Sequence, residues 1–332
     1  MTTYKEAGVD IDVANTGLSK IKKHVNNTYN KYTLSDVGGF GGCFNFDFKK
    51  YKNPVLVSSV DGVGTKLLIA SLANKHNTIG QCLVNHSVND ILAVGAKPLF
   101  FLDYFATGKL NNDILEEVVK GFSIACKENS CVLIGGETAE MPGFYDDNKY
   151  DVSGTIVGVV DKDEMMPNRK VEVGNLLVGL KSTGLHTNGY SLARKVLFDH
   201  YKIGEYVAEI DSTIENELLK IHKSYFPLVE GILKNKWLKS ISHITGGGIV
   251  ENTLRVVDDD YDININWDTW EINNIFKLIM KKGNVPISDM RRTFNLGIGL
   301  ILIINENHLD DLKSHLNIFN EECIVIGDVV AK

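Results

Sequence analysis

The hydrophobic positions along the chain follow two spacings that alternate. Short apolar, β-branched runs such as Pro54–Val60 and Leu99–Phe105 predict buried strands. Between them lie longer segments such as Thr78–Gly95, whose apolar residues recur at helical spacing and whose last residue is a glycine typical of a helix end. The first half is therefore predicted to alternate strands and helices.

The second half repeats this alternation after a polar stretch. Lys, Asp, Glu, Pro and Asn gather in Asp161–Gly174, and this predicts a boundary between domains at residues 1–165 and 166–332. Beyond it, Leu296–Ile304 is predicted to be a strand and Thr213–Leu238 to be helical. Strand–helix alternation in both halves indicates an α/β or α+β fold with two domains of similar size.

Length and charge narrow the function. A chain of 332 residues exceeds what one core usually holds, and its formal net charge of −7 is unsuited to wrapping nucleic acid. No apolar run reaches the roughly 18 residues that a membrane span needs. An odd number of cysteines without a C-x-x-C pair favours reduced thiols, so we expect a cytoplasmic protein. The five cysteines are Cys43, Cys82, Cys126, Cys131 and Cys323.

The strongest local motif is Asp61-Gly-Val-Gly-Thr-Lys66, directly after an apolar strand. Its two glycines let the backbone approach an anion, and the helix that follows presents free N–H groups to it. Lys66 offers a positive charge for phosphate and Asp61 an oxygen ligand for a hard cation. The motif does not match a Walker P-loop, and a plain strand–turn–helix with a capping Asp61 is the alternative.

Acidic and amide side chains share the predicted helix Thr78–Gly95. Asp90 follows His86 by one turn, and Asn85 and Asn89 form the adjacent stripe. Such polar residues need partners if they are buried, and a magnesium-bound nucleotide would supply them. An exposed helical face is the other interpretation.

Two further glycine-rich segments lie in the first half. Glu137 follows Gly135-Gly136 at a strand end, which is common for metal ligands, although an acid stabilising a helix N-terminus has the same pattern. Asp36–Cys43 has four glycines and predicts either a mobile flap with N–H donors or a flexible linker.

The second half contains two loops of small polar residues between a strand and a helix. They are Ser182–Ser191, which includes His186 and Asn188, and His243–Gly248. This arrangement is typical of phosphate cradles, and His186 is a candidate hydrogen-bond donor or acid to a substrate, although a lone histidine is often structural.

These segments, in this order, resemble the aminoimidazole ribonucleotide synthetase family over essentially the whole chain. The blocks that carry the resemblance are Tyr4–Asp10, Asp61–Lys66, Val88–Asp90, Pro98–Tyr104, Ala106–Lys109, Gly135–Pro142, His186–Ser191, Thr245–Gly248 and Arg292–Asn295. The sequence departs from the family at Asn85-His86, where members often have Ala-Met. Arg291 also stands where an aromatic or apolar residue is common.

The resemblance implies a fold, a reaction and partners. It implies a two-domain ATP-binding synthetase fold and a homodimer whose N-terminal strands form a shared barrel. It also implies ATP with Mg²⁺, often K⁺, and formylglycinamidine ribonucleotide as the substrate that is cyclised, without nucleic-acid or membrane partners. Thiamine-monophosphate kinase, selenophosphate synthetase, a hydrogenase-maturation dehydratase and a nucleotide-binding regulatory module without turnover are the alternatives.

The same resemblance assigns residues to roles. Metal ligands are Asp61, Asp90 and Glu137. ATP contacts are Gly38, Gly39, Gly41, Asp61, Gly62, Gly64, Thr65 and Lys66. Substrate contacts are His186, Asn188, Thr245, Gly246 and Gly247. Lys66, Asp90 and His186 are the candidate catalytic residues.

Overall fold

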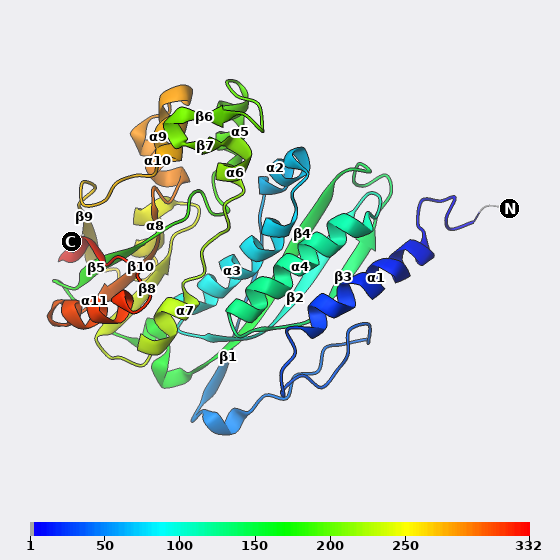
Figure 1. Ribbon diagram of the computed structural model, residues 1–332. Coiled ribbons are helices and arrows are strands. Elements are labelled where there is room, and N and C mark those ends of the chain that lie inside the picture. The colour runs from blue at the N-terminus through cyan, green and yellow to red at the C-terminus, as the bar shows by residue number, and fades with distance from the viewer. Residues whose placement is uncertain (1–2) are drawn as a thin grey trace.

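Two β-sheets organise the chain, one in each half (Figure 1). In the computed structural model, which describes residues 3–332, neighbouring strands of the first sheet run antiparallel except for the parallel pair β2 and β3. The first sheet has the order β1 (Pro54–Gly62), β4 (Tyr150–Asp161), β2 (Lys97–Thr107) and β3 (Val132–Glu140). Its strand order and register decide where the acidic residues of the first half lie.

Three long helices, α1 (Ile11–Asn26), α3 (Asn77–Ala93) and α4 (Asn112–Glu128), pack side by side over one face of this sheet (Figure 1). The N-termini of α1 and α4 are capped by Asp10 and Asn111, whose side chains accept backbone N–H groups of the first turn. A shorter helix, α2 (Lys66–Ala73), follows β1. On the opposite face of the sheet, side chains of β1 such as Leu56 and Val60 are exposed in the single chain.

The second sheet is antiparallel throughout, in the order β8 (Leu238–His243), β10 (Ile298–Ile304), β5 (Leu176–Lys181), β11 (Ile324–Ala331) and β9 (Tyr261–Ile265). Strand β10, which lies between β8 and β5, is buried along its whole length because both faces of the sheet are covered there. The helices around it are α5 (Tyr190–Phe198), α8 (Gly248–Leu254), α9 (Asn274–Gly283), α10 (Ile287–Thr293) and α11 (Leu309–Asn317). β6 (Tyr206–Val207) and β7 (Ser212–Thr213) form a small hairpin.

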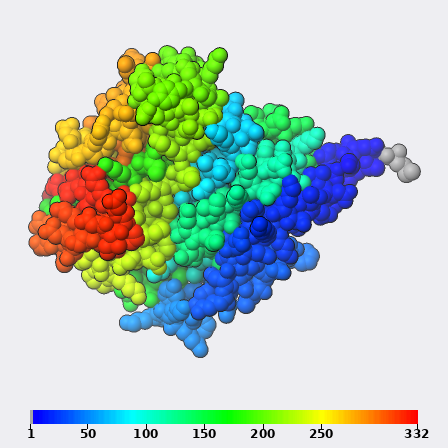
Figure 2. All heavy atoms as spheres, viewed as in Figure 1, coloured from blue at the N-terminus to red at the C-terminus, as the bar shows by residue number. Residues whose placement is uncertain are grey.

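Helix α3 connects the two halves. Its apolar residues, such as Leu83 and Leu92, share one continuous core with Leu300 and Leu302 on one face of the second sheet. The second half, which runs from green through yellow to red in Figure 2, therefore lies directly against the helices of the first. Polar residues on the same helix consequently meet loops from the far end of the sequence.

The predicted α/β fold with two domains is confirmed, and the predicted strands and helices of the first half appear within a few residues, except that β3 continues through Gly135-Gly136 to Glu140, so Glu137 lies within the strand. One prediction is wrong: Thr213–Leu238 is not a continuous helix. It contains only α6 (Ile214–Leu218), α7 (Phe226–Val229) and a short turn. Its central part is extended because the carbonyls of Lys220 and His222 accept hydrogen bonds from side chains of the first half.

β4 and β5 are joined by short turns over residues 162–168, and the expected domain boundary near residue 165 stays a prediction. Among residues 3–332, no helix is both long and apolar enough to cross a bilayer.

Candidate active site

Asp90 lies where α3, β1 and the end of β8 meet. Its Oδ1 is 2.8 Å from Nδ1 of His243, and its Oδ2 accepts a hydrogen bond of 3.2 Å from the Ser59 hydroxyl. Nε2 of His86, one helical turn earlier, lies 3.7 Å from the same Oδ2. Asp90 is thus held from three elements while its carboxylate remains partly exposed.

Asp61 faces the same imidazole. It lies near the end of β1, and its Oδ2 is 2.9 Å from Nε2 of His86. The structure therefore brings Asp61 and Asp90, two of the three predicted metal ligands, to the same nitrogen, Nε2 of His86.

The carboxylates and imidazoles of this site shift one another's pKa towards the charged forms of Asp90 and His86. Burial by itself raises the pKa of Asp90, but the hydrogen bond and charge of His243, with the charge of His86, lower it to about 2. Burial lowers the pKa of His86, and Asp61 and Asp90 outweigh that effect, so its pKa is raised. The pocket consequently favours anionic carboxylates that attract a cation.

Four buried histidines form a cluster behind these carboxylates: His86, His186, His222 and His243. His222 Nε2 lies 3.1 Å from His243 Nε2, and the ring of His222 stacks on that of His186 at 4.0 Å between centroids. His222 is not predicted as a site residue, because the pattern of Thr213–Leu238 predicts a helix and does not single it out. His186 was predicted to contact substrate, but its ring is buried among these imidazoles and is 1% exposed.

The four buried histidines lead us to expect that the folded protein loses stability as pH falls. Burial and nearby positive groups hold the pKa of His186 and His222 well below the usual 6.5. Below pH 6.5 the unfolded chain therefore binds protons that the folded chain does not, and stability falls as pH falls. We expect a loss of up to about 1.4 kcal/mol per pH unit for each of the two rings.

Urea unfolding at several pH values between 7.5 and 5.5 measures this slope. His222→Asn is expected to reduce it, whereas His308→Asn, at an exposed histidine paired with Asp311, leaves it unchanged. A free energy of unfolding that does not vary over this interval contradicts the assignment of neutral buried rings.

The amide stripe on α3 is buried and satisfied by the protein itself. Asn85 Nδ2 donates to the His222 carbonyl at 2.8 Å, and Asn89 Nδ2 donates to the Lys223 carbonyl at 2.8 Å. Asn89 Oδ1 also accepts from the Tyr225 backbone N–H. Both earlier interpretations are therefore wrong for these two residues, since they are neither exposed nor free to bind a nucleotide.

Lys66 is also buried, with no exposed surface. Its Nζ donates to the carbonyls of His186 and Lys220 at 2.9 and 2.6 Å and lies 3.1 Å from Cys82 Sγ. An ammonium group has three N–H donors, and these partners use all of them. Lys66 would have to leave them to reach a phosphate, so its assignment to ATP and catalysis stays a prediction.

The two polar loops of the second half meet near the Asp61–Lys66 turn. Thr65 and Ser191 hydroxyls lie 3.2 Å apart, and Asn188 lies beside Gly246, where an added Cβ would come within 3.6 Å of its Oδ1. Asn188 Nδ2 is buried without a hydrogen-bond partner in the described part of the chain. Gly247 takes a φ of +99°, which favours glycine. Of the predicted substrate residues, Asn188 and the loop Thr245–Gly247 are thus brought together.

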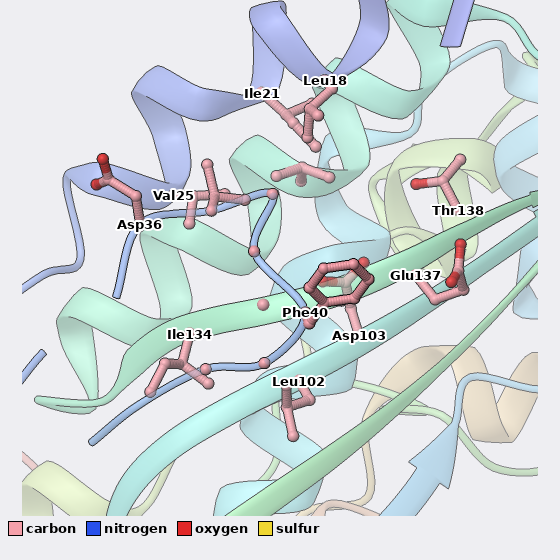
Figure 3. A pocket seen from close by; sticks show the side chains of 18 of the residues that line it. Leu18, Ile21, Val25, Asp36, Phe40, Leu102, Asp103, Ile134, Glu137 and Thr138 are labelled. Carbon is pink, nitrogen blue, oxygen red and sulfur yellow. The ribbon is translucent and has the colours of Figure 1, made fainter. Parts of the chain in front are cut away.

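The glycine-rich segment forms one wall of a separate cavity of about 530 Å³ (Figure 3). Helix α1, β2, β3 and α4 form the other walls, with the apolar side chains of Leu18, Ile21 and Val25 facing Gly38–Gly42 across it. This size is in the range of small-molecule sites. The predicted ATP contacts Gly38, Gly39 and Gly41 all line this cavity.

Glu137 lines the same cavity, away from the two aspartates. The strand register aligns Asp61 with Gly154, Gly154 with Asp103, and Asp103 with Gly136. Three strand spacings, roughly 14 Å, therefore separate the rows of Asp61 and Glu137. A single chain does not gather the three predicted metal ligands around one ion, because the sheet places Glu137 at its opposite edge.

Asp103 shares this cavity and was not singled out from the sequence. Burial raises its pKa to about 7, and the charge of Glu137 adds to the effect. Position 136, directly opposite Asp103, must be a glycine, because a Cβ added to Gly136 would lie 2.2 Å from Asp103 Oδ1.

Two such domains, with acidic and glycine-rich segments next to their strands, match the models of one protein family. The model of the AIR synthase related protein N-terminal domain matches residues 47–160, and that of the C-terminal domain matches residues 172–332. The chain therefore belongs to the AIR synthase related family.

Relatives extend over nearly the whole chain. The chain is 48% identical over 329 residues to a phosphoribosylformylglycinamidine cyclo-ligase of Geobacter metallireducens, covering 98% of this chain and 94% of that protein. It is 46% identical over 330 residues to a protein of the same name from Alkaliphilus oremlandii, covering 99% and 97%.

Solved structures share the fold at low sequence identity. A thiamine-monophosphate kinase from Stenotrophomonas maltophilia superimposes with a TM-score of 0.69 at 15% identity, covering 95% of this chain and 93% of that one. The hydrogenase maturation protein HypE in complex with ATP gives a TM-score of 0.66 at 16% identity, covering 96% and 86%. These similarities establish the two-domain arrangement.

Proposed function

We propose that this chain catalyses the ATP-dependent cyclisation of formylglycinamidine ribonucleotide to aminoimidazole ribonucleotide, with release of ADP and phosphate. The observation that carries the proposal is the identity of 46–48%, over nearly full length, to proteins named for this ligase activity. The pair Asp61–Asp90, next to the polar loops of the second half, supplies a site for it.

The reaction needs an activated oxygen. A formamide oxygen is a poor leaving group, so in the proposed mechanism it attacks the γ-phosphorus of ATP and ADP leaves. The amidine nitrogen then attacks the formyl carbon, loses a proton, and expels the oxygen as phosphate. Such transfers depend on alignment and charge neutralisation more than on covalent participation of the protein. Holding the substrate folded makes the ring closure intramolecular.

The residues divide this work between two places. Asn188, with its free Nδ2, and the backbone of Thr245–Gly247 are proposed to hold the substrate. ATP is proposed to extend from the cavity behind Gly38–Gly42, which would hold the end of the nucleotide remote from the ion, to the Asp61–Lys66 turn, where its phosphates would lie. Asp61 and Asp90 offer carboxylate oxygens, the donors that Mg²⁺ prefers, and would hold the ion that neutralises phosphate charge.

The uncovered face of the first sheet supports a homodimer. Every second residue of β1 points to that face, and Leu56 and Val60 are 64% and 66% exposed. Apolar side chains on an open sheet face are typical of an interface. We propose that two chains join these faces, as a barrel shared between subunits would require.

The double variant Leu56→Glu/Val60→Glu is expected to shift the protein from dimer to monomer in sedimentation velocity, because two buried carboxylates would oppose each other across the interface. Leu72→Glu, at an exposed leucine on α2, is the control and is expected to leave the dimer intact. A wild-type protein that sediments as a monomer, or a double variant that remains a dimer, counts against this interface.

The decisive assay for the activity is ADP release with and without formylglycinamidine ribonucleotide. The proposal predicts ADP formation only with that substrate, together with stoichiometric aminoimidazole ribonucleotide. ATP binding without substrate-dependent ADP would indicate a regulatory module, and turnover with thiamine monophosphate would indicate a kinase. Replacing K⁺ by Na⁺ in the same assay tests the expected potassium requirement.

A further inference from the structure

The imidazoles of His86 and His243 offer nitrogen ligands that the proposed ring closure does not use, next to the Asp90 carboxylate proposed for Mg²⁺. His86, Asp90 and His243 each offer one ligand atom, and these atoms all lie within 4.8 Å of one another. Ligands bound about 2.1 Å from a tetrahedral zinc ion are about 3.4 Å apart. Side-chain movements of about 1 Å would therefore close the set around one ion.

We propose that His86, His243 and Asp90 bind one divalent first-row transition-metal ion, with Zn²⁺ as the representative, without any nucleotide. Two imidazole nitrogens and one carboxylate suit Zn²⁺ and Co²⁺, whereas Mg²⁺ takes oxygen ligands. Binding of this kind goes beyond the ring-closing activity and does not depend on it.

Each of the two imidazoles is held in its orientation by a contact at the ring nitrogen that does not face Asp90. His86 directs Nε2 to the carboxylates, and its Nδ1 lies 2.7 Å from the Thr187 hydroxyl. His243 directs Nδ1 to Asp90, and its Nε2 lies 3.1 Å from Nε2 of His222. A hydrogen bond at the second ring nitrogen fixes tautomer and ring direction, as in protein metal sites.

The ligand-free contacts mark where an ion would lie. His86 Nε2 is 2.9 Å from Asp61 Oδ2, and His243 Nδ1 is 2.8 Å from Asp90 Oδ1. An ion would replace the protons shared in these two histidine–carboxylate contacts, so its binding releases protons. Asp61 borders this set through His86 but is not one of its three members.

The cluster opens to solvent from one side. The side chains of His86 and His243 are 7% and 3% exposed, whereas those of Asp61 and Asp90 are 32% and 27% exposed. An ion can therefore enter past the carboxylates, and that side can retain a water ligand, as in zinc sites with an open position.

The experiment titrates Co²⁺ and Zn²⁺ into chelator-treated, nucleotide-free protein, with Co²⁺ followed by visible absorption and Zn²⁺ by calorimetry. We expect one ion per chain with the visible bands of a low-coordinate Co²⁺ site. His86→Ala is expected to weaken binding at least 100-fold. Thr187→Val is expected to weaken it by about 10–100-fold, because the His86 ring loses the hydroxyl contact that holds it in its orientation. His308→Ala, at an exposed histidine, is the matched control and binds as the wild type does.

Variants are compared only after circular dichroism shows that they melt as the wild type does. Absence of one-to-one binding overturns the proposal, as does equal affinity in wild type and His86→Ala. Displacement of Zn²⁺ by an equal concentration of Mg²⁺ also overturns it, since that result describes an ordinary site for hard cations. None of these results affects the ring-closure assay with Mg²⁺, so the two proposals fail separately.

Discussion

Replacing Asp90 by asparagine is expected to lower substrate-dependent ADP formation by about 10²–10³-fold, a typical loss when one preorganised electrostatic contact is removed from an active site. The amide keeps the shape of the carboxylate: its oxygen can accept a hydrogen bond from His243, and its NH₂ group can donate to the Ser59 hydroxyl, which can also accept. It removes the negative charge that would hold the ion. The expected loss is in turnover, with near-normal folding.

Steady-state kinetics and urea unfolding of the same preparation measure both parts of this prediction. Asp113→Asn is the matched control, because that carboxylate is exposed and only pairs with Lys20 on the surface. Full activity of Asp90→Asn removes Asp90 from the site. A variant that loses activity only because it unfolds assigns Asp90 a structural role instead.

Lys66→Met is expected to lower the free energy of unfolding by about 1–3 kcal/mol, the usual cost of a buried polar group that loses its partner. Methionine fills a similar volume but removes the ammonium donor from two carbonyls: that of His186 keeps only a 3.2 Å hydrogen bond from the Tyr190 hydroxyl, and that of Lys220 keeps only a 4.0 Å contact from Cys82 Sγ. Because these carbonyls belong to the second half of the chain, the loss loosens the contact between the two halves.

Urea denaturation measures this loss against Lys75→Met, whose exposed ion pair with Glu215 is worth less than about 1 kcal/mol. The same two variants are tested for ATP affinity. If Lys66→Met unfolds at the wild-type urea concentration but binds ATP much more weakly, Lys66 contacts phosphate and is not the tie between the halves that its contacts indicate.

Local patterns in the sequence predicted the elements around the site well. The apolar run before Asp61 predicts β1, and the helical spacing around Asp90 predicts α3. These signals are local, because strand and helix periodicity are written in consecutive residues. The motif glycines likewise locate the loops of the second half.

The partners of the polar residues could not be predicted in the same way. Asn85 and Asn89 bond to carbonyls more than 130 residues later in the chain, and nothing in either segment specifies that meeting. Those same contacts hold residues around His222 extended, against their helical pattern. Tertiary hydrogen bonds here override a local preference.

The position of Glu137 has a different cause. Its motif is as distinct as that of Asp61, but its place follows from the order of strands in the sheet. Strand order depends on which distant segments pair, and a single sequence does not specify it. The expectation of three gathered carboxylates therefore failed at one residue out of three within a single chain.

The most direct test is a crystal structure of the protein with Mg²⁺ and a non-hydrolysable ATP analogue. We expect a magnesium ion about 2.1 Å from a carboxylate oxygen of Asp61 or Asp90 and in contact with the phosphates. An ion bound to the phosphates with both aspartates still on His86 and His243, and no oxygen of either within reach, would contradict it.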